Sequence, residues 1–324
     1  MNTNVLVIGE IYRNVVTKST LEVIEIAGDI SEHVSVVFVV SSEPNEGFKG
    51  VEQLPAESVS IICSEENDDD RGIYDFDTEV ISMLVESKDY TIVLLSKTDY
   101  GSVVGPRVAF RNDMEYLSDC TNISNKNKFE VTRPVYGGVA YADYLVSDES
   151  KCIISMRPGS KLLTGSRGEP SIEIKKHKKS FDLKPKMVKE IYEEVDGVKL
   201  EDANVVVSGG RGLGSSTGFE DLNHLANILE GALGASRAAC DAGWIDHSHQ
   251  VGLTGKTVSP DLYIAVGISG ASQHMAGCSM SRNIVAINSD GDANIFREAR
   301  FGVIGNWKPI IQAFISTIED LNIR

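Results

Sequence analysis

The stretch IAVGISGASQHMAG, at positions 264–277, holds the residues best suited to chemistry. Its apolar start predicts a strand, and a glycine-rich turn then leads into the first turns of a helix that carries His274. Main-chain N–H groups and the helix dipole converge on such a turn, so it suits an anion. His274 is open to two interpretations: a histidine hydrogen-bonded within the fold, or a donor that stabilises an anionic ring.

Further glycine-containing loops lie near the other predicted strands. They are GGRG (209–212), GASRAAC (234–240), QVGLTGK (250–256) and INSDGD (287–292). In an open α/β sheet such loops gather at one edge and form the ligand crevice. A ligand that many loops contact is expected to be a large cofactor rather than a small metabolite.

These loops do not match either of two common nucleotide-binding motifs. In SGGRGLG (208–214), Gly210 and Gly212 match the first two glycines of GxGxxG, but the third position holds Ser215. GLTGKT ends like a phosphate-binding P-loop, but Gln250 occupies the place of its first glycine. With no GxSxG or HExxH motif either, the sequence indicates a binding crevice without a hydrolytic apparatus.

Arginine and histidine side chains flank the crevice loops. Arg211 and Arg237 stand beside small residues, where a guanidinium group could contact a phosphate or stack on a flat aromatic ring; surface ion pairs are the alternative. His247 and His249 have no carboxylate or thiol at a ligand offset, so we expect polar loop residues and no metal site.

Composition restricts the class of protein. The 324 residues are 42% hydrophobic and 24% charged, which is typical of a globular chain long enough for two domains. The net charge of −16 argues against nucleic acid or an anionic membrane as the main partner. Five scattered cysteines, no targeting segment and no long apolar span favour the cytoplasm, without membrane insertion.

The elements that would position these residues form an α/β pattern in both halves. Apolar runs at 5–9, 34–40, 59–63 and 90–96 alternate with helical segments, and the acidic stretch 65–70 is a predicted solvated loop. From about residue 120 the strand-like segments predict an antiparallel extension of the first sheet. The basic stretch 175–190 is either a solvated linker or a partner-docking segment.

The second half begins again with a strand at 203–208. Thr217 and Glu220 predict a capping box at the start of the next helix. Asn306 is the predicted N-cap of the last helix, which is expected to bury Ile311, Phe314, Ile315 and Ile318. We therefore expect an α/β protein with an N-terminal mixed-sheet domain over 1–194 and a C-terminal Rossmann-like domain over 195–324.

Long strings of residues match one known family. In the second half they are VVVSGGRGL (205–213), GASRAACDAGW (234–244), QVGLTGKTVSPDLYIAVGISGASQHMAG (250–277) and IVAINSD (284–290). In the first half they are VLVIGE (5–10), GSVVGPRVAFR (101–111), SDCTNIS (118–124), RPVYGG (133–138) and SMRPG (155–159). In these strings, which span nearly the whole chain, the sequence resembles the alpha subunit of electron transfer flavoproteins.

The resemblance implies an electron carrier without its own substrate turnover. It implies FAD in the C-terminal domain and, facing the N-terminal domain, a beta subunit of related fold that carries AMP or a second FAD. Electrons would come from a flavin dehydrogenase of the acyl-CoA dehydrogenase type and pass to a quinone oxidoreductase or another acceptor, with electron bifurcation left open. The cofactor-binding residues that the motifs imply are Arg211, Ser236, Arg237, Gln250, Val251, Gly252, Leu253, Thr254, Gly267, Ser269, Gly270, Ala271, Ser272, Gln273, His274, Asn288, Asp290, Asn306 and Trp307.

Some of these residues receive specific roles from the resemblance. Arg237 would lie against the isoalloxazine ring, the Thr254 hydroxyl near N5, and His274 near N1 and the C2 carbonyl. Asn288 and Asp290 would lie toward the adenosine half. Because reduced flavin carries negative charge around N1, donors and positive groups there should raise its potential.

The sequence departs from the family at two places. Leu253 stands where the family commonly has glutamine, and Asn306-Trp307 replaces an Asp-Leu pair near the adenine end. Asparagine caps a helix about as well as aspartate, and Trp307 could stack on adenine. Two other classes stay open at this point: an enzyme that turns over a small substrate with a nucleotide, and a nucleotide-sensing or assembly module built on the first domain.

Overall fold

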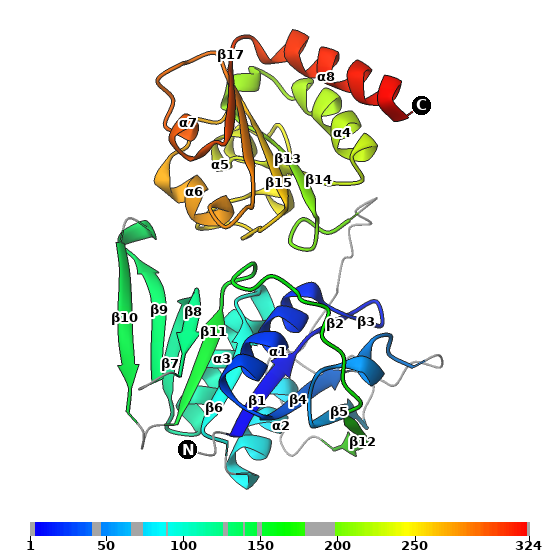
Figure 1. Cartoon of the computed structure of the whole chain (residues 1–324), viewed down its shortest axis with the longest axis vertical. Helices are drawn as coiled ribbons and strands as arrows, with labels where there is room; N and C mark the ends of the chain where they lie inside the picture. Colours follow the sequence, from blue (N-terminus) through cyan, green and yellow to red (C-terminus); the bar gives the residue numbers. More distant parts are fainter. Residues whose placement is uncertain are drawn as a thin grey trace. The chain divides into compact units, whose positions relative to one another are not determined.

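A computed structural model describes residues 4–40, 47–65, 74–88, 90–125, 129–138, 140–147, 151–178 and 198–322. The chain forms two compact units (Figure 1), one made of residues 1–135 and 141–192, the other of residues 136–140 and 193–324. Both are built from parallel strands and helices, so the predicted two-domain α/β fold is confirmed.

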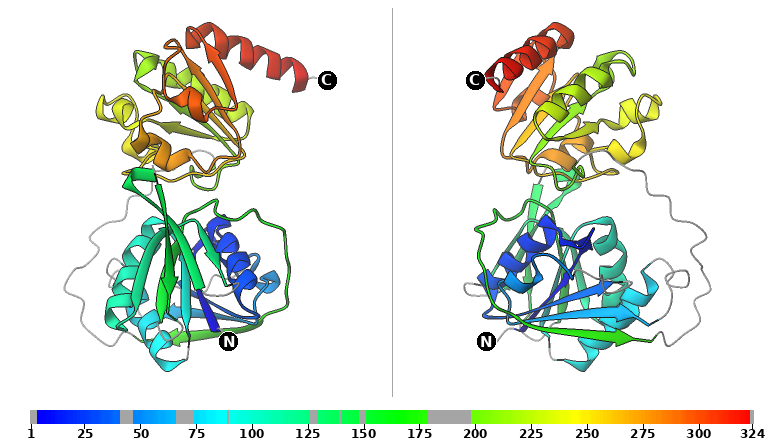
Figure 2. Two further views of the ribbon diagram at one scale, coloured as in Figure 1. Left: turned by 60° about the vertical axis from the view of Figure 1, so that its left-hand side comes forward. Right: turned by 90° about the vertical axis from the view of Figure 1, so that its right-hand side faces the viewer.

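The first unit is organised around a seven-stranded sheet in the order β12-β5-β4-β1-β6-β11-β7, in which all neighbours run parallel. Helix α1 covers one face of this sheet, and α2 and α3 cover the other (Figure 2). Alternate residues of β1 therefore enter different cores: Val5 and Val7 pack on the α1 side, and Leu6 and Ile8 on the side of α2 and α3. The strands and helices are β1 (Asn4–Gly9), β4 (His33–Val40), β5 (Ser58–Ser64), β6 (Ile92–Ser96), β7 (Glu115–Cys120), β11 (Cys152–Met156), β12 (Ser171–His177), α1 (Lys18–Ile30), α2 (Asp75–Ser87) and α3 (Asp99–Arg111), with the short elements β2 (Ile11–Tyr12), β3 (Val15–Val16) and η1 (Val51–Gln53).

The predicted antiparallel extension of the first sheet is wrong. β11 lies between β6 and β7, and β12 lies beside β5, all in parallel pairs. Antiparallel pairing occurs instead in a separate three-stranded sheet of β8 (Asn122–Ser124), β9 (Phe129–Val135) and β10 (Ala140–Val146), where β8 and β9 run antiparallel. Every residue of β11 is buried, and a continuous apolar run of this kind is typical of a central parallel strand.

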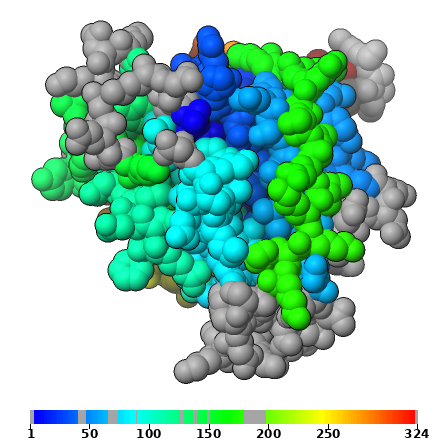
Figure 3. Space-filling model, turned by 90° about the horizontal axis from the view of Figure 1, so that it is seen from below, coloured from blue at the N-terminus to red at the C-terminus, as the bar shows by residue number. Residues whose placement is uncertain are grey.

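β12 is an edge strand, and all its residues except His177 are exposed. Figure 3 shows the segment that leads into β12, in green, on the outer surface of the first unit. Most of the basic stretch 175–190 lies outside the described residues, as does most of the acidic stretch 65–70, so their predicted roles stay predictions.

The second unit contains a five-stranded sheet in the order β14-β13-β15-β16-β17, again parallel throughout. Helices α4, α5 and α8 pack into the core on one face, and α6 and α7 into the core on the other. The elements are β13 (Val205–Gly209), β14 (Ala232–Ala235), β15 (Leu262–Val266), β16 (Ile284–Asn288), β17 (Phe301–Ile304), α4 (Gly218–Ile228), α5 (Arg237–Asp241), α6 (Ser272–Cys278), α7 (Ile295–Glu298) and α8 (Trp307–Asn322), with the short helices η3 (Tyr136–Gly138), η4 (Arg211–Leu213) and η5 (His247–His249).

The last helix, α8, lies beside α4 in both Figure 1 and Figure 2. The predicted N-cap is confirmed, because the Asn306 side-chain oxygen accepts a hydrogen bond from the Lys308 N–H at 3.0 Å. Ile311 is fully buried, with Ile315 and Ile318 packed beside it, but the predicted burial of Phe314 is wrong: it is 37% exposed. It lies three positions after Ile311, at the margin of the contact stripe.

The capping box predicted at the start of α4 is also wrong. Thr217 has helical backbone angles, and its hydroxyl pairs with that of Ser215 at 2.8 Å. An N-cap side chain needs an extended backbone to reach the next N–H groups, and the angles of Thr217 do not allow this. None of the helices in the described ranges combines the length and apolar character needed to cross a bilayer.

Candidate functional site

Strand order reverses between β13 and β15, where one neighbour leads to β14 and the other to β16. In open parallel sheets, ligands bind in the crevice beyond the carboxyl ends of the strands at such a reversal. The loops after β13 and β15 touch there: the Gly210 and Gly212 N–H groups donate to the carbonyls of Val266 and Gly267 at 2.8 and 2.9 Å. A Cβ at Gly210 would lie 2.2 Å from the Gly267 oxygen, so this contact requires glycine.

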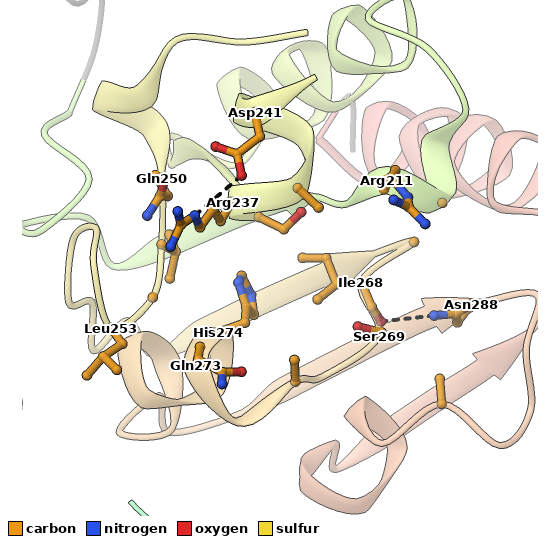
Figure 4. A pocket seen from close by; sticks show the side chains of 18 of the residues that line it. Arg211, Arg237, Asp241, Gln250, Leu253, Ile268, Ser269, Gln273, His274 and Asn288 are labelled. Atoms are coloured by element: carbon orange, nitrogen blue, oxygen red, sulfur yellow. Dashed lines mark hydrogen bonds and ion pairs between the residues drawn. The ribbon is translucent and has the colours of Figure 1, made fainter. Parts of the chain in front are cut away.

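A cavity of about 770 Å³ opens at this edge (Figure 4). All five loops that the sequence singled out contribute to its wall, so their predicted convergence is confirmed. The lining residues are Arg211, Gly212, Ser236, Arg237, Ala238, Asp241, Gln250, Val251, Gly252, Leu253, Thr254, Gly267, Ile268, Ser269, Ala271, Gln273, His274, Asn288, Asp290 and Ala293.

Four predicted cofactor residues lie outside this wall. Asn306 and Trp307 line an adjoining hollow of about 230 Å³, which shares Asn288 with the main cavity. Gly270, at φ +80°, packs against the start of α7, where a Cβ would meet the Ile295 nitrogen at 2.2 Å. Ser272 is the first residue of α6 and lines neither space.

Five lining residues were not predicted: Gly212, Ala238, Asp241, Ile268 and Ala293. Gly212, Ala238, Asp241 and Ile268 lie inside strings that the sequence already singled out, and Asp241 follows Arg237 by one helical turn. Ile268 and Ala293 give no chemical signal, because apolar side chains at a cavity wall look like core residues in a sequence.

The loop after β15 leaves its main-chain N–H groups available to a ligand. Among the described residues, no group accepts from the N–H groups of residues 269–273. The loop is held from behind, since the Ile268 carbonyl accepts from the Asn288 side chain at 2.9 Å (Figure 4) and the Ser269 carbonyl from the Ile295 N–H at 3.1 Å. A fixed row of N–H donors is suited to phosphate oxygens.

Gln250 orients Thr254 at the opposite side of the cavity. The Gln250 side chain is 5% exposed; its Oε1 lies 3.2 Å from Nδ1 of His247, and its Nε2 donates to the Thr254 hydroxyl oxygen at 3.0 Å. Because that oxygen already accepts a hydrogen bond, the hydroxyl proton of Thr254 is the group left to donate to a ligand.

Arg237 reaches over the cavity from α5. Its Nε lies 3.3 Å from an Asp241 carboxylate oxygen, and the Arg237 side chain is 67% exposed (Figure 4). Exposed ion pairs contribute at most about 1 kcal/mol, so this pairing holds the guanidinium group only weakly. Its remaining N–H groups are donors that a ligand can recruit.

His274 is the most buried titratable group of the wall, with 7% of its surface exposed. Its Nε2 lies 2.9 Å from the Tyr263 hydroxyl, and its Nδ1 has no hydrogen-bond partner among the described residues. Burial lowers the pKa of His274 to about 4, although the backbone of Val251 acts in the opposite direction. His274 is therefore a neutral imidazole at pH 7 and acts through hydrogen bonding rather than charge.

No group of three or more His, Cys, Asp or Glu side chains in the described part of the chain is placed to hold a metal ion. His249 instead lies 2.8 Å from the Leu233 carbonyl through Nδ1, and His247 contacts Gln250. Both histidines lie in the short helix η5 rather than in a loop, and the expectation that they bind no metal stays a prediction.

Two family models match the chain. The electron transfer flavoprotein domain matches residues 5–181, and the electron transfer flavoprotein FAD-binding domain matches residues 199–279. The second match covers β13 to α6, the elements that form most of the cavity wall.

Known proteins match over long stretches as well. The chain is 33% identical over 326 residues to the electron transfer flavoprotein subunit alpha of Bacillus subtilis (strain 168), with 100% of both chains covered. It is 39% identical over 248 residues to that of Thermoanaerobacterium thermosaccharolyticum, with 75% of each chain covered. Protein FixB of Clostridium saccharobutylicum is 36% identical over 252 residues, covering 76% of this chain and 75% of its own. The resemblance inferred from the sequence is confirmed, and the chain belongs to the electron transfer flavoprotein family as an alpha subunit.

Proposed function

We propose that this chain is the FAD-binding alpha subunit of a heterodimeric electron transfer flavoprotein. It takes electrons from a flavin dehydrogenase of the acyl-CoA dehydrogenase type and passes them to a quinone oxidoreductase or another acceptor. The observation that carries this proposal is that main-chain N–H donors, a neutral imidazole and exposed guanidinium groups all line the same cavity. Family membership favours this carrier over a nucleotide-dependent enzyme or a sensing module.

The residues present fit FAD. Its pyrophosphate is matched by the N–H groups of residues 269–273, and its polar ring edge by Nδ1 of His274, which is buried without a partner. The adjoining hollow beside Asn306 and Trp307 offers a flat aromatic wall for the adenine. A volume of about 770 Å³ lies in the range of cofactor pockets.

Bound FAD supplies the redox chemistry, and the chain sets its environment. His274 and Thr254 donate hydrogen bonds toward the ring, and Arg237 places positive charge near it. Each of these stabilises a more negative flavin, so together they raise its potential. Leu253, which is 51% exposed at the cavity, offers an apolar contact where relatives of this family commonly have a glutamine.

We assign residues 195–324 to the FAD-binding domain and residues 1–194 to the scaffold that faces the beta subunit. The beta subunit is proposed to carry AMP in a simple transfer protein or a second FAD in a bifurcating one. The cytoplasm is the proposed compartment.

The visible spectrum of the chain co-purified with its beta subunit tests the proposal. Flavin bands near ~450 nm are expected, and a reduced acyl-CoA dehydrogenase should bleach them. The flavin count then separates the two types: one FAD and one AMP per pair indicates simple transfer, and two FAD indicate bifurcation. A complex that shows no flavin bands after incubation with FAD would overturn the proposal.

A further inference from the structure

The His274 ring is held from the core by one phenol. Tyr263, in β15, is fully buried, and its hydroxyl oxygen lies 2.9 Å from Nε2 of His274 in α6. The two ring centroids are 6.1 Å apart with planes tilted by 54°, so the rings meet through this hydrogen bond rather than by stacking. His274 points into the cavity from α6 (Figure 4), while Tyr263 belongs to the core behind it.

The protonation states of the pair decide the direction of the hydrogen bond. Burial raises the pKa of Tyr263 well above its usual value and lowers that of His274 to about 4, so both are neutral at pH 7. A phenol O–H is a stronger donor than an imidazole N–H, and an imidazole nitrogen is a stronger acceptor than a phenol oxygen. The hydrogen bond is therefore O–H of Tyr263 to Nε2 of His274.

Two other side chains influence the phenol, Ser208 of β13 and Cys278 of α6. Ser208 lowers the pKa of Tyr263, but its hydroxyl oxygen has no hydrogen-bond partner among the described residues. Cys278 raises the pKa of Tyr263 and has its own pKa lowered by Tyr263, as expected if sulfur accepts from the phenol, but sulfur is a weak acceptor. The imidazole nitrogen is the best acceptor available to the phenol.

We propose that Tyr263 is a positioning residue: its O–H donates to Nε2 of His274 and thereby keeps the single imidazole proton on Nδ1. A neutral imidazole carries one N–H, and the partner of one nitrogen decides where that proton resides. Nδ1–H is then the donor of the imidazole, buried at the cavity wall beside the backbone of Val251. The part of this proposal that concerns the flavin rests on the proposed function, whereas the tautomer itself does not.

The tautomer can be read directly from the ¹⁵N resonances of the histidine ring. The chain is labelled with [¹⁵N]histidine, purified with its unlabelled beta subunit and measured at pH 7.5 without flavin, and a His274→Asn sample assigns the signal. The expected result is a protonated Nδ1 and a bare Nε2 for His274. If the unmodified chain carries the proton on Nε2 of His274, the proposal is overturned, and no variant is needed to show it.

The variant Tyr263→Phe tests whether the Tyr263 hydroxyl is what keeps the imidazole proton of His274 on Nδ1. The expected result is a shift of the proton toward Nε2. The control Tyr90→Phe, which changes another buried tyrosine, should leave the His274 signals unchanged.

FAD binding gives a second test in the flavin-loaded complex. Tyr263→Phe should weaken FAD binding about fivefold, the size of one hydrogen bond, and should have no further effect when His274 is already changed to Asn. A folded Tyr263→Phe chain that keeps the proton on Nδ1 would contradict the role of Tyr263. If no flavin binds, the proposed function fails while the tautomer result still stands.

Discussion

At the scale of single residues, the cavity combines one buried neutral imidazole with two exposed guanidinium groups. Sequence alone identified His274, Arg211 and Arg237 as candidates, because their positions beside glycine-rich turns are local features. It did not predict that His274 is uncharged, since that property depends on burial by β15 and α6, which meet only in the folded chain.

The buried His274 should make the second unit sensitive to acid. Its pKa is about 4 in the fold against an ordinary value of 6.5, so between these pH values the unfolded chain binds more protons than the folded one. The stability that the neutral, buried His274 ring contributes is complete above pH 6.5 and is lost as the pH falls toward 4. We expect a loss of about 2–3 kcal/mol in unfolding free energy from pH 7 to pH 4.5.

Urea denaturation of the flavin-free chain, followed by the fluorescence of Trp244 and Trp307, measures this loss. Both tryptophans of the chain lie in the second unit, so the signal reports the unit that contains His274. His274→Asn removes the titrating group and should lose correspondingly less stability over the same pH range. Equal losses in the two proteins would show that His274 is not buried as a neutral ring.

Arg237→Ala should lower the midpoint potential of the bound FAD by about 30 mV, which for a two-electron couple is about 1.4 kcal/mol. The reason is the loss of positive charge beside a ring that becomes negative on reduction. A redox titration of the complex measures the change, with Arg282→Ala as a control: Arg282 is also exposed and ion-paired, with Asp261, but does not line the cavity. The role of Arg237 is refuted if both variants titrate like the unmodified complex.

At the scale of elements, sequence patterns predicted most strands and helices but not all of their neighbours. β13 and β15 follow from apolar runs, and the cap of α8 follows from Asn306. The parallel insertion of β11 into the sheet was missed because the pattern of a strand does not state which strand it pairs with. The apolar run of β11 was nevertheless a signal that it would be buried on both faces.

Asn306→Ala should destabilise the second unit by about 1 kcal/mol, because the Lys308 N–H loses its acceptor at the start of α8. Asn306→Asp restores a side-chain acceptor and should keep nearly full stability. The urea midpoints of unfolding of the unmodified chain and of the two variants, all without flavin, measure these differences in stability. An alanine variant as stable as the aspartate variant would mean that the cap contributes nothing.

Gly210→Ala should disrupt the cavity floor. Its Cβ would lie 2.2 Å from the Gly267 oxygen and 2.7 Å from the Gly267 carbonyl carbon, so the loop that ends β15 must move. We expect at least about tenfold weaker FAD binding, measured by titration of the flavin-free complex. Gly28→Ala is the matched control: nothing lies within 4 Å of its added Cβ, and a helical alanine should leave FAD binding unchanged. Normal FAD affinity in Gly210→Ala would show that the two loops need not touch.

At the scale of the whole chain, the two-domain α/β organisation was predictable because each half repeats strands and helices with their own apolar periodicity. The carrier function was predictable from motif strings that cover nearly the whole chain, whereas physical reasoning alone reached only a crevice for a large anionic cofactor. The wall residue Ala293 could not be found in advance, because only the folded sheet brings it to the cavity.

The central claim, that FAD occupies the cavity beyond β13 and β15, is tested most directly by filling that cavity. Ala238 is exposed and lines it, so Ala238→Trp should fill the space without disturbing the core, whereas Ala313→Trp places the same bulk on the exposed side of α8. FAD content is measured by absorbance near ~450 nm after each chain is purified with its beta subunit and incubated with FAD. We predict that the flavin assigned to this chain is lost in Ala238→Trp and retained in Ala313→Trp; a folded Ala238→Trp complex with the full flavin content would contradict the claim.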